Sequence, residues 1–572
     1  MKIIEFMNIV KKPIFHIFAL IIALTLALSL RLIRLGITPL SNMEAGIALQ
    51  ALAVGQGTEA VFGEHAAYVG LTGLDFFLFA PGNFLARFWP AIFGAMIVFI
   101  PFLFREQIGY FPASILALVL AITPEMVGLS RIIGSPIIAF VSLFLAFGFL
   151  VRRKPVLSGL TFALSLMGGS GFWTGIVLFL LGLAAARKFL DFKIERPLFN
   201  LFFDRIFRIK FFAAWLVTIG IVGTGFFLSP ESLSGVFSGL VNFIHGFGES
   251  YTQPFYLRPL ALIGYSLPAV ILGIWGGIRA ILNRKKLDLF LFILAGLGLA
   301  YFILYPGAEP ADLIWVTLPL WTLSARLVFS VWRLPEDNRL IMAVTGLVVV
   351  IIFMFLLMTL RSILNPGFSQ DIQLVTIIAL FGGLVLLIAL VLLVTFGWSE
   401  EIALSGFLIG LSVVIIFGMI AVTTRTTGLS TEDSIEVWYP DQQKLSTRWL
   451  KIAIERVLDW NKRRVEPLEI VVVDLDLPGM HWALQEYDDV AFVPYLPPTT
   501  QPGILISNIL TQPEISNSYR GQDLVWSEKA RWQDLSAMQV LSWLIIRDAP
   551  MDYEEIILWV RTDLMPDEQL TQ

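Results

Sequence analysis

The chain has 572 residues, of which 57% are hydrophobic and only 15% are charged, and its formal net charge is −4 at pH 7. A soluble domain holds about 25% charged residues, so this composition excludes an ordinary soluble protein. The absence of cysteine excludes disulfides and thiolate chemistry. No basic stripe with interleaved aromatic residues supports a nucleic-acid partner. Long apolar runs alternate with short basic clusters, and the sequence therefore predicts a polytopic α-helical membrane protein.

The first apolar run follows Lys11 and Lys12 and ends at Arg31. Lysine and arginine mark cytoplasmic loops, so the N-terminus is predicted to lie inside. No small-residue cleavage site follows this run, which is predicted to remain as the first span. The next apolar stretch, 66–80, has about 15 residues and contains Asp75. It is short for a crossing and predicts a juxtamembrane or re-entrant helix.

Later apolar runs bring the predicted total to about 13 crossings and place the C-terminus outside. The basic loops 152–154, 188–210 and 283–286 then face the cytoplasm, and the amphipathic loop 188–210 is predicted to lie on the inner membrane surface. The later crossings are predicted at 88–104, 112–129, 134–151, two short spans around 168–171, 211–228, 259–282, 287–304, 312–331, 340–360, 373–396 and 402–422.

From about Gly428 onward the composition becomes that of a globular domain. Ser446 and Thr447 are predicted to cap a helix, and residues 468–473 are predicted to form a central strand buried on both faces. Alternating strands and helices favour a small α/β domain. The sequence thus predicts a transmembrane domain over 1–427 and an extracytoplasmic α/β domain over 428–572.

The first outer loop, about 31–87, and the outer segment near residue 130 hold the polar residues best suited to chemistry. Each of their motifs is common by itself, and their order and spacing are more specific. In chain order the motifs are Glu44-Ala45, His65 followed by Tyr68, Arg87 followed by Pro90-Ala91, and Pro124 followed by Ser130-Arg131.

In these motifs the chain resembles the GT-C superfamily of polyprenyl-phosphate-sugar-dependent glycosyltransferases, and within it the protein-mannosyltransferase-like branch, glycosyltransferase family 39. The resemblance covers roughly the first 190 residues, together with the many-span plan and the outer domain. It implies a GT-C-like bundle in the plasma membrane. It also implies transfer of a hexose, with inversion, from a polyprenyl-phosphate carrier to a protein or glycan acceptor of the cell envelope, on the outer face.

The resemblance further implies roles for single residues. An outer-loop carboxylate would take the proton of the acceptor hydroxyl, and arginines would hold the phosphate of the donor. The predicted catalytic residues are Glu44 as the base, with Glu64 and His65 assisting. The predicted phosphate contacts are Arg34, Arg131 and Arg258.

One position departs from the family pattern. The base of the family is usually the aspartate before Glu-Ala, and this chain has Met43 there. Three functions therefore stay open: an enzyme in which Glu44 or Glu64 has taken over, a degenerate relative that binds the lipid-sugar or assembles with a partner, and a lipid flippase or transporter. The spans after residue 211 carry almost no mid-span charge, which disfavours the transporter.

Single residues also have structural alternatives. Glu44 can equally cap the helix predicted in the outer loop, and Arg131 and Arg258 can equally extend to lipid headgroups. No cofactor is predicted. A divalent metal is left open, because no paired acidic motif occurs in the outer loops and the four histidines are scattered.

Overall fold

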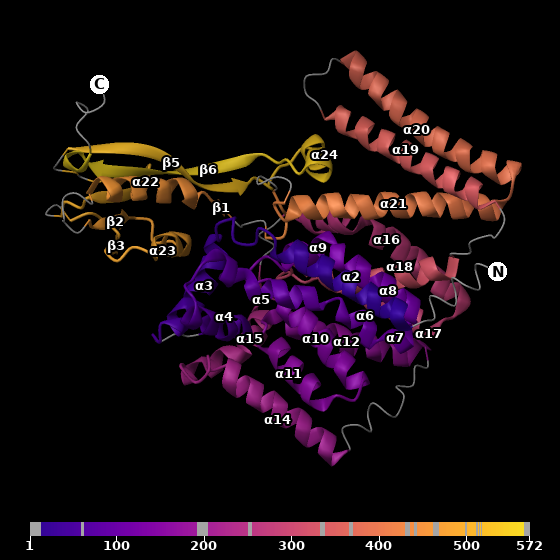
Figure 1. Cartoon of the computed structure of the whole chain (residues 1–572), viewed down its shortest axis with the longest axis horizontal. Helices are drawn as coiled ribbons and strands as arrows, with labels where there is room; N and C mark the ends of the chain where they lie inside the picture. The colour runs from indigo at the N-terminus through magenta and orange to yellow at the C-terminus, as the bar shows by residue number, and fades with distance from the viewer. Residues whose placement is uncertain are drawn as a thin grey trace.

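The computed structural model describes residues 13–58, 62–190, 204–249, 254–331, 338–364, 370–429, 435–439, 443–461, 468–497, 500–510, 513, 515 and 518–565. Over these residues the chain forms a helical bundle with a sheet domain against one end (Figure 1). The helices α7 and α17 lie toward the opposite end of the bundle, and α19 and α20 lie side by side next to α21.

The helices of the bundle follow one another with short connections. In chain order they are α2 Pro13–Leu32, α3 Asn42–Gly55, α4 Ala66–Leu78, α5 Asn83–Met96, α6 Phe99–Leu103, α7 Arg105–Ile108, α8 Tyr110–Ile122, α9 Pro124–Leu129, α10 Ile137–Val151, α11 Pro155–Leu166, α12 Ser170–Leu190, α14 Arg205–Val222, η1 Pro230–Phe237, α15 Ser238–His245, α16 Leu257–Asn283, α17 Lys286–Leu304, η2 Pro310–Leu313, α18 Ile314–Val331, α19 Arg339–Ile363, α20 Gln370–Gly397 and α21 Glu400–Thr426.

Among the described residues, nine helical segments are long and apolar enough to cross a membrane. Each overlaps a predicted crossing, and the other predicted crossings fall on the shorter helices α8, α10, α11 and α14. The chain is therefore a multi-pass membrane protein, as the sequence predicts. Helix α4 has 13 residues, too few for a crossing that needs about 20, and it packs against α3.

The start of α14 differs from the prediction. Residues 205–210, predicted to end a surface loop, form the first turns of α14, and residues 191–203 lie outside the described residues. The cause is a helix cap: the backbone N–H of Ile206 donates to Asp204 Oδ1 at 2.9 Å. A capped helix can begin before the apolar run, because its first basic side chains extend toward water.

The C-terminal domain contains one mixed six-stranded sheet with the order β1-β5-β6-β4-β2-β3. All four residues of β2 are buried, as predicted, but β2 lies beside the edge strand β3, so the prediction that it is central is wrong. The long antiparallel strands β5 and β6 contain many charged residues, so their sequence does not show a clear strand pattern. Because these strands extend the sheet on the β4 side, its two middle strands are β6 and β4. The elements are β1 Lys444–Leu445, α22 Thr447–Asn461, β2 Ile470–Val473, α23 Pro478–Leu484, β3 Val490–Val493, β4 Ile504–Asn508, β5 Tyr519–Ala530, α24 Ala537–Ile546, β6 Met551–Arg561 and η3 Thr562–Leu564.

Tryptophans join this domain to the bundle. The ring of Trp438 stacks on Tyr265 of α16 with centroids 3.8 Å apart. Trp482 of α23 donates from Nε1 to Asn83 Oδ1 at 2.8 Å, and Trp543 of α24 is fully buried among residues of both domains. The domain also has its own core between α22 and the sheet. Independent folding of 428–572 stays a prediction.

Candidate active site

A cavity of about 610 Å³ lies at the end of the bundle that the C-terminal domain covers. Its wall combines α3, the turn before α4, the N-terminus of α12, α15, the segment 301–312 and Tyr439. The volume lies within the range of about 300–1,000 Å³ that is usual for small-ligand sites. The ionisable residues on its wall are Glu64, His65, His245, Glu249, Tyr301, Tyr305, Glu309, Asp312 and Tyr439.

One wall holds Glu64 and His65, two of the predicted catalytic residues. The backbone N–H of Ser170, the first residue of α12, donates to Glu64 Oε2 at 3.3 Å. The other oxygen, Oε1, lies 3.7 Å from His65 Nε2. A carboxylate at a helix N-terminus can accept hydrogen bonds from N–H groups that have no partner within the helix. About a quarter of the Glu64 side chain (26%) remains exposed to the cavity.

The glycines before α12 let His65 approach this helix end. Gly169 has φ +95°, in the left-handed region that glycine adopts easily. A Cβ atom at Gly169 would lie 3.3 Å from His65 Cε1 and Nδ1. Gly169 is therefore needed both for the turn and for the position of the imidazole ring.

Another part of the wall carries two carboxylates close together in sequence. Glu309 precedes η2 and forms a reciprocal cap with Asp312 inside it, in which the backbone N–H of Glu309 donates to Asp312 Oδ2 at 3.1 Å. Burial, reinforced by the carboxylates of Asp312, Glu249 and Glu64, raises the pKa of Tyr305 to about 12. Burial, reinforced by nearby carboxylates, also raises the pKa of Tyr439 well above its usual value.

The described part of the wall is acidic. It carries four carboxylates and two histidines, and no lysine or arginine lines it among the described residues. Such a wall can accept hydrogen bonds from sugar hydroxyls and can take up a proton. A search of the described residues finds no group of three or more His, Asp or Glu side chains that could hold a metal ion.

Glu44, the predicted base, has a different environment from Glu64. Its carboxylate forms a bidentate pair with Arg87, at 2.9 Å from Nε and 2.7 Å from Nη2. It also accepts the backbone N–H groups of Ser41 at 3.1 Å and of Ile133 at 3.2 Å. The side chains of Glu44 and Arg87 are only 2% and 6% exposed.

Glu44 therefore takes the capping role that the sequence left open, with Ser41 and Glu44 forming a capping box on α3. Among the described residues that line the cavity, α3 contributes Met43, Ile47 and Gln50, and not Glu44. The position at which the family pattern has its aspartate thus faces the cavity, and this chain places a methionine there.

The three predicted phosphate contacts lie apart from the cavity wall. Arg131 donates to the carbonyl oxygens of Leu30, Arg31 and Ile33 at 2.9–3.1 Å, and to that of Thr427 at 3.2 Å. Its guanidinium thereby caps the C-terminal ends of α2 and α21.

Arg258 caps the end of α17 in the same way. It donates to the carbonyl oxygens of Phe302, Ile303, Tyr305 and Pro306 at 2.8–3.2 Å and to that of Ala308. Arg34 is exposed and has φ 56°. Phosphate binding by Arg34, Arg131 and Arg258 stays a prediction.

The sequence did not predict four of the ionisable residues on the wall, namely His245, Glu249, Glu309 and Asp312. They lie far from the first outer loop in sequence, and the packing of α12 against α15 and α17 brings them to it. The polar stretch 305–312 between two apolar runs was the available signal. Sequence spacing alone could not show that this stretch faces Glu64.

The bundle with its C-terminal domain has the fold that the resemblance to the GT-C superfamily predicts. One solved structure with this fold is the crystal structure of ArnT from Cupriavidus metallidurans bound to undecaprenyl phosphate. It matches with a TM-score of 0.54 at 13% identity, over 96% of this chain and 99% of that chain. The apo structure of the same protein matches with a TM-score of 0.51 at 14% identity, over the same shares.

A weaker match is the archaeal oligosaccharyltransferase AglB from Archaeoglobus fulgidus in complex with an inhibitory peptide and a dolichol-phosphate. Its TM-score is 0.45 at 12% identity, over 86% of this chain and 69% of that chain. No protein-family model matches the chain, and no curated protein matches its sequence. At the level of the fold, the two ArnT structures confirm the resemblance to the GT-C superfamily.

Proposed function

We propose that the protein is a glycosyltransferase that moves a sugar from a polyprenyl-phosphate-linked donor to an acceptor on the outer side of the membrane. The observation that carries this proposal is the acidic cavity under the C-terminal domain, with Glu64 at the N-terminus of α12. The donor class is inferred from the ArnT structure, which has the same fold over nearly its whole length and is bound to undecaprenyl phosphate.

Within this proposal Glu64 is the general base. It accepts the proton of the acceptor hydroxyl while the acceptor oxygen forms a bond to the anomeric carbon of the sugar. The bond from that carbon to the phosphate oxygen breaks, and its electron pair leaves with the polyprenyl phosphate. A single displacement of this kind inverts the anomeric centre. His65, whose Nε2 lies 3.7 Å from Glu64 Oε1, orients the carboxylate.

The test is transfer of radiolabelled sugar from a polyprenyl-phosphate donor pool in membranes. General-base catalysis contributes about 10²–10⁴-fold, so Glu64→Gln should lower kcat by that order and leave donor binding nearly unchanged. Glu249→Gln is the matched control, because it removes the same charge from the exposed part of the same wall. Equal losses in both variants would contradict the role of Glu64.

A second function is favoured by Met43. This side chain faces the cavity where the family pattern has its aspartate, as expected for a relative that binds the lipid-sugar without transferring it. Met43→Asp separates the two functions. In an active enzyme with Glu64 as base, a further carboxylate should leave transfer unchanged or lower it. In a binding protein with an intact cavity, Met43→Asp should create transfer that wild-type membranes lack.

A further inference from the structure

A second cavity, of about 370 Å³, lies at the other end of the bundle, between α7, α16, α17 and α18. Figure 1 shows α7 and α17 at the end away from the sheet. The loop 283–286 at this cavity is one of those predicted to face the cytoplasm. The cavity is therefore separate from the acidic cavity under the C-terminal domain.

Two of the basic side chains on the wall of this cavity are not paired with a carboxylate among the described residues. Arg326 pairs with Asp288, and Glu106 pairs with Arg152, so both carboxylates of the wall are neutralised. Arg279 donates from Nη1 to Ser330 Oγ at 2.8 Å. Neither Arg279 nor Lys285 has a carboxylate partner among the described residues, and both line the cavity. The cavity is thus complementary to an anion.

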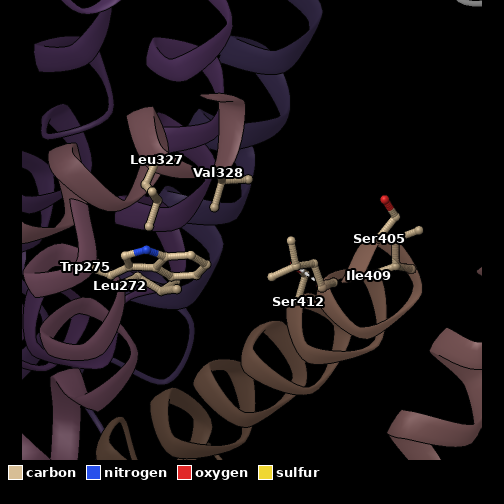
Figure 2. Close-up of a pocket in the computed structure, with 8 residues that line it drawn as sticks. Leu272, Trp275, Leu327, Val328, Ser405, Ile409 and Ser412 are labelled. Atoms are coloured by element: carbon tan, nitrogen blue, oxygen red, sulfur yellow. Dashed lines mark hydrogen bonds between the residues drawn. The ribbon is translucent and has the colours of Figure 1, made fainter. Parts of the chain in front are cut away.

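An apolar groove adjoins this cavity between α16, α18 and α21. Figure 2 shows Leu272, Trp275, Leu327 and Val328 on one side of it, across from residues 405–412 of α21. Leu327 lines both the groove and the cavity. Trp275 in the groove and Arg279 in the cavity are four residues apart on α16, which places them one turn apart on the same face.

We infer that the cavity and the groove together bind one anionic glycerophospholipid of the inner leaflet. The phosphate of the headgroup would contact Arg279 and Lys285, and one acyl chain would lie in the groove against Trp275. A free phosphate would use only the cavity, and a neutral lipid would use only the groove. The two adjoin at Leu327, and Trp275 and Arg279 lie one turn apart on α16, which favours a ligand with both parts. Basic pockets between membrane helices on the cytoplasmic side are suited to anionic headgroups.

The first test measures the headgroup. The purified full chain is equilibrated with phosphatidylglycerol or phosphatidylcholine, and retained lipid is counted by native mass spectrometry. The chain should retain phosphatidylglycerol preferentially. Each lost cation should weaken retention by about fivefold, so the double variant Arg279→Gln, Lys285→Gln should lose about 25-fold.

Lys286→Gln is the matched control, because Lys286 is the exposed neighbour of Lys285 and does not line the cavity among the described residues. It should change retention less than twofold. Equal loss with Lys286→Gln would show a general surface-charge effect and overturn the inference. Equal retention of phosphatidylcholine, or displacement of the lipid by millimolar inorganic phosphate, would overturn it as well.

The second test measures the acyl chain. Phosphatidylglycerol with brominated acyl chains should quench the part of the fluorescence that disappears in Trp275→Phe. Ser412→Phe, which fills the groove and leaves the cavity intact, should abolish this quenching and lower retention. The thermal midpoint of each variant confirms that it is folded. Unchanged quenching in Ser412→Phe would show that the chain lies elsewhere and would contradict the two-part site.

Discussion

Glu44 and Glu64 both lie between α2 and α5 and have opposite surroundings. Glu44 is buried and holds Arg87 with both oxygens, and that arginine also donates to the carbonyl oxygens of Thr38 and Pro39. Glu64 faces an acidic cavity and accepts one backbone N–H, and His65 Nε2 lies 3.7 Å from its other oxygen. The contrast separates two roles of a carboxylate. Glu44, whose oxygens are occupied by a buried arginine, stabilises the conformation of its segment, whereas Glu64, on the wall of an open cavity, can accept a proton from a ligand.

The largest expected effect on stability concerns Glu44. Glu44→Gln leaves Arg87 buried without its carboxylate, and removing one partner of a buried pair costs about 3–5 kcal/mol. Thermal unfolding of the purified protein should show a clearly lower midpoint. Glu64→Gln, which breaks no buried ion pair, should change the free energy of unfolding by about 0.5 kcal/mol or less.

The same two variants decide which carboxylate is the base. If Glu44→Gln keeps its thermal midpoint and loses transfer, while Glu64→Gln keeps transfer, then Glu44 is the base, as the sequence predicts, and Glu64 is not. The double variant Glu44→Gln, Arg87→Gln removes both charges of the buried pair and keeps side chains of similar size. It should recover part of the lost stability, because no uncompensated charge then remains buried.

The next effect concerns Arg131, whose donors are directed at the ends of α2 and α21. Hydrogen bonds from a charged group are worth about 1.5–3 kcal/mol, so Arg131→Gln should lower the free energy of unfolding by about that amount. Arg131→Lys should not restore it, because a single ammonium cannot reach carbonyls on two helices. The exposed Arg34→Gln is the control. A fall in donor affinity at constant thermal midpoint would instead support the predicted phosphate contact.

The fold was largely predictable, because apolar runs separated by basic clusters determine where membrane helices lie. Departures occur where one contact outweighs the hydropathy pattern, as at Asp204, which starts α14 before its apolar run. In the sheet, β2 was predictable from its apolar run, but its place beside the edge depends on β5 and β6.

The candidate site was only partly predictable. Glu64 and His65 were found from the first outer loop, and both line the cavity. Glu309 and Asp312 were not, because their approach depends on how distant helices pack. The arginines show a second limit: the sequence places Arg131 and Arg258 at helix ends, but cannot tell whether a guanidinium faces a phosphate or the last carbonyl groups of a neighbouring helix.

A third carboxylate, Glu436, extends the comparison and carries the smallest expected effect. It lies in the segment after α21, where the hydroxyl of Tyr265 donates to its Oε2, and Arg547 lies over the Tyr265 ring at 4.6 Å from the centroid. Unlike Glu44 it has no ion pair with an arginine among the described residues. Burial raises its pKa from 4.5 to about 6, although Arg547 and the Tyr265 hydrogen bond act in the opposite direction.

The raised pKa gives stability a defined pH dependence. The folded protein holds the Glu436 proton more tightly than the unfolded chain, so this contribution is fully present below pH 4.5 and is lost as the pH rises through about 6. Glu436→Gln, which is neutral throughout, should flatten that part of the curve. Thermal midpoints measured between pH 4.5 and pH 7 for wild type and variant should converge at low pH and separate above pH 6, with the variant higher. Parallel curves would mean that Glu436 takes up its proton at the same pH in the folded protein and in the unfolded chain, which would contradict the raised pKa.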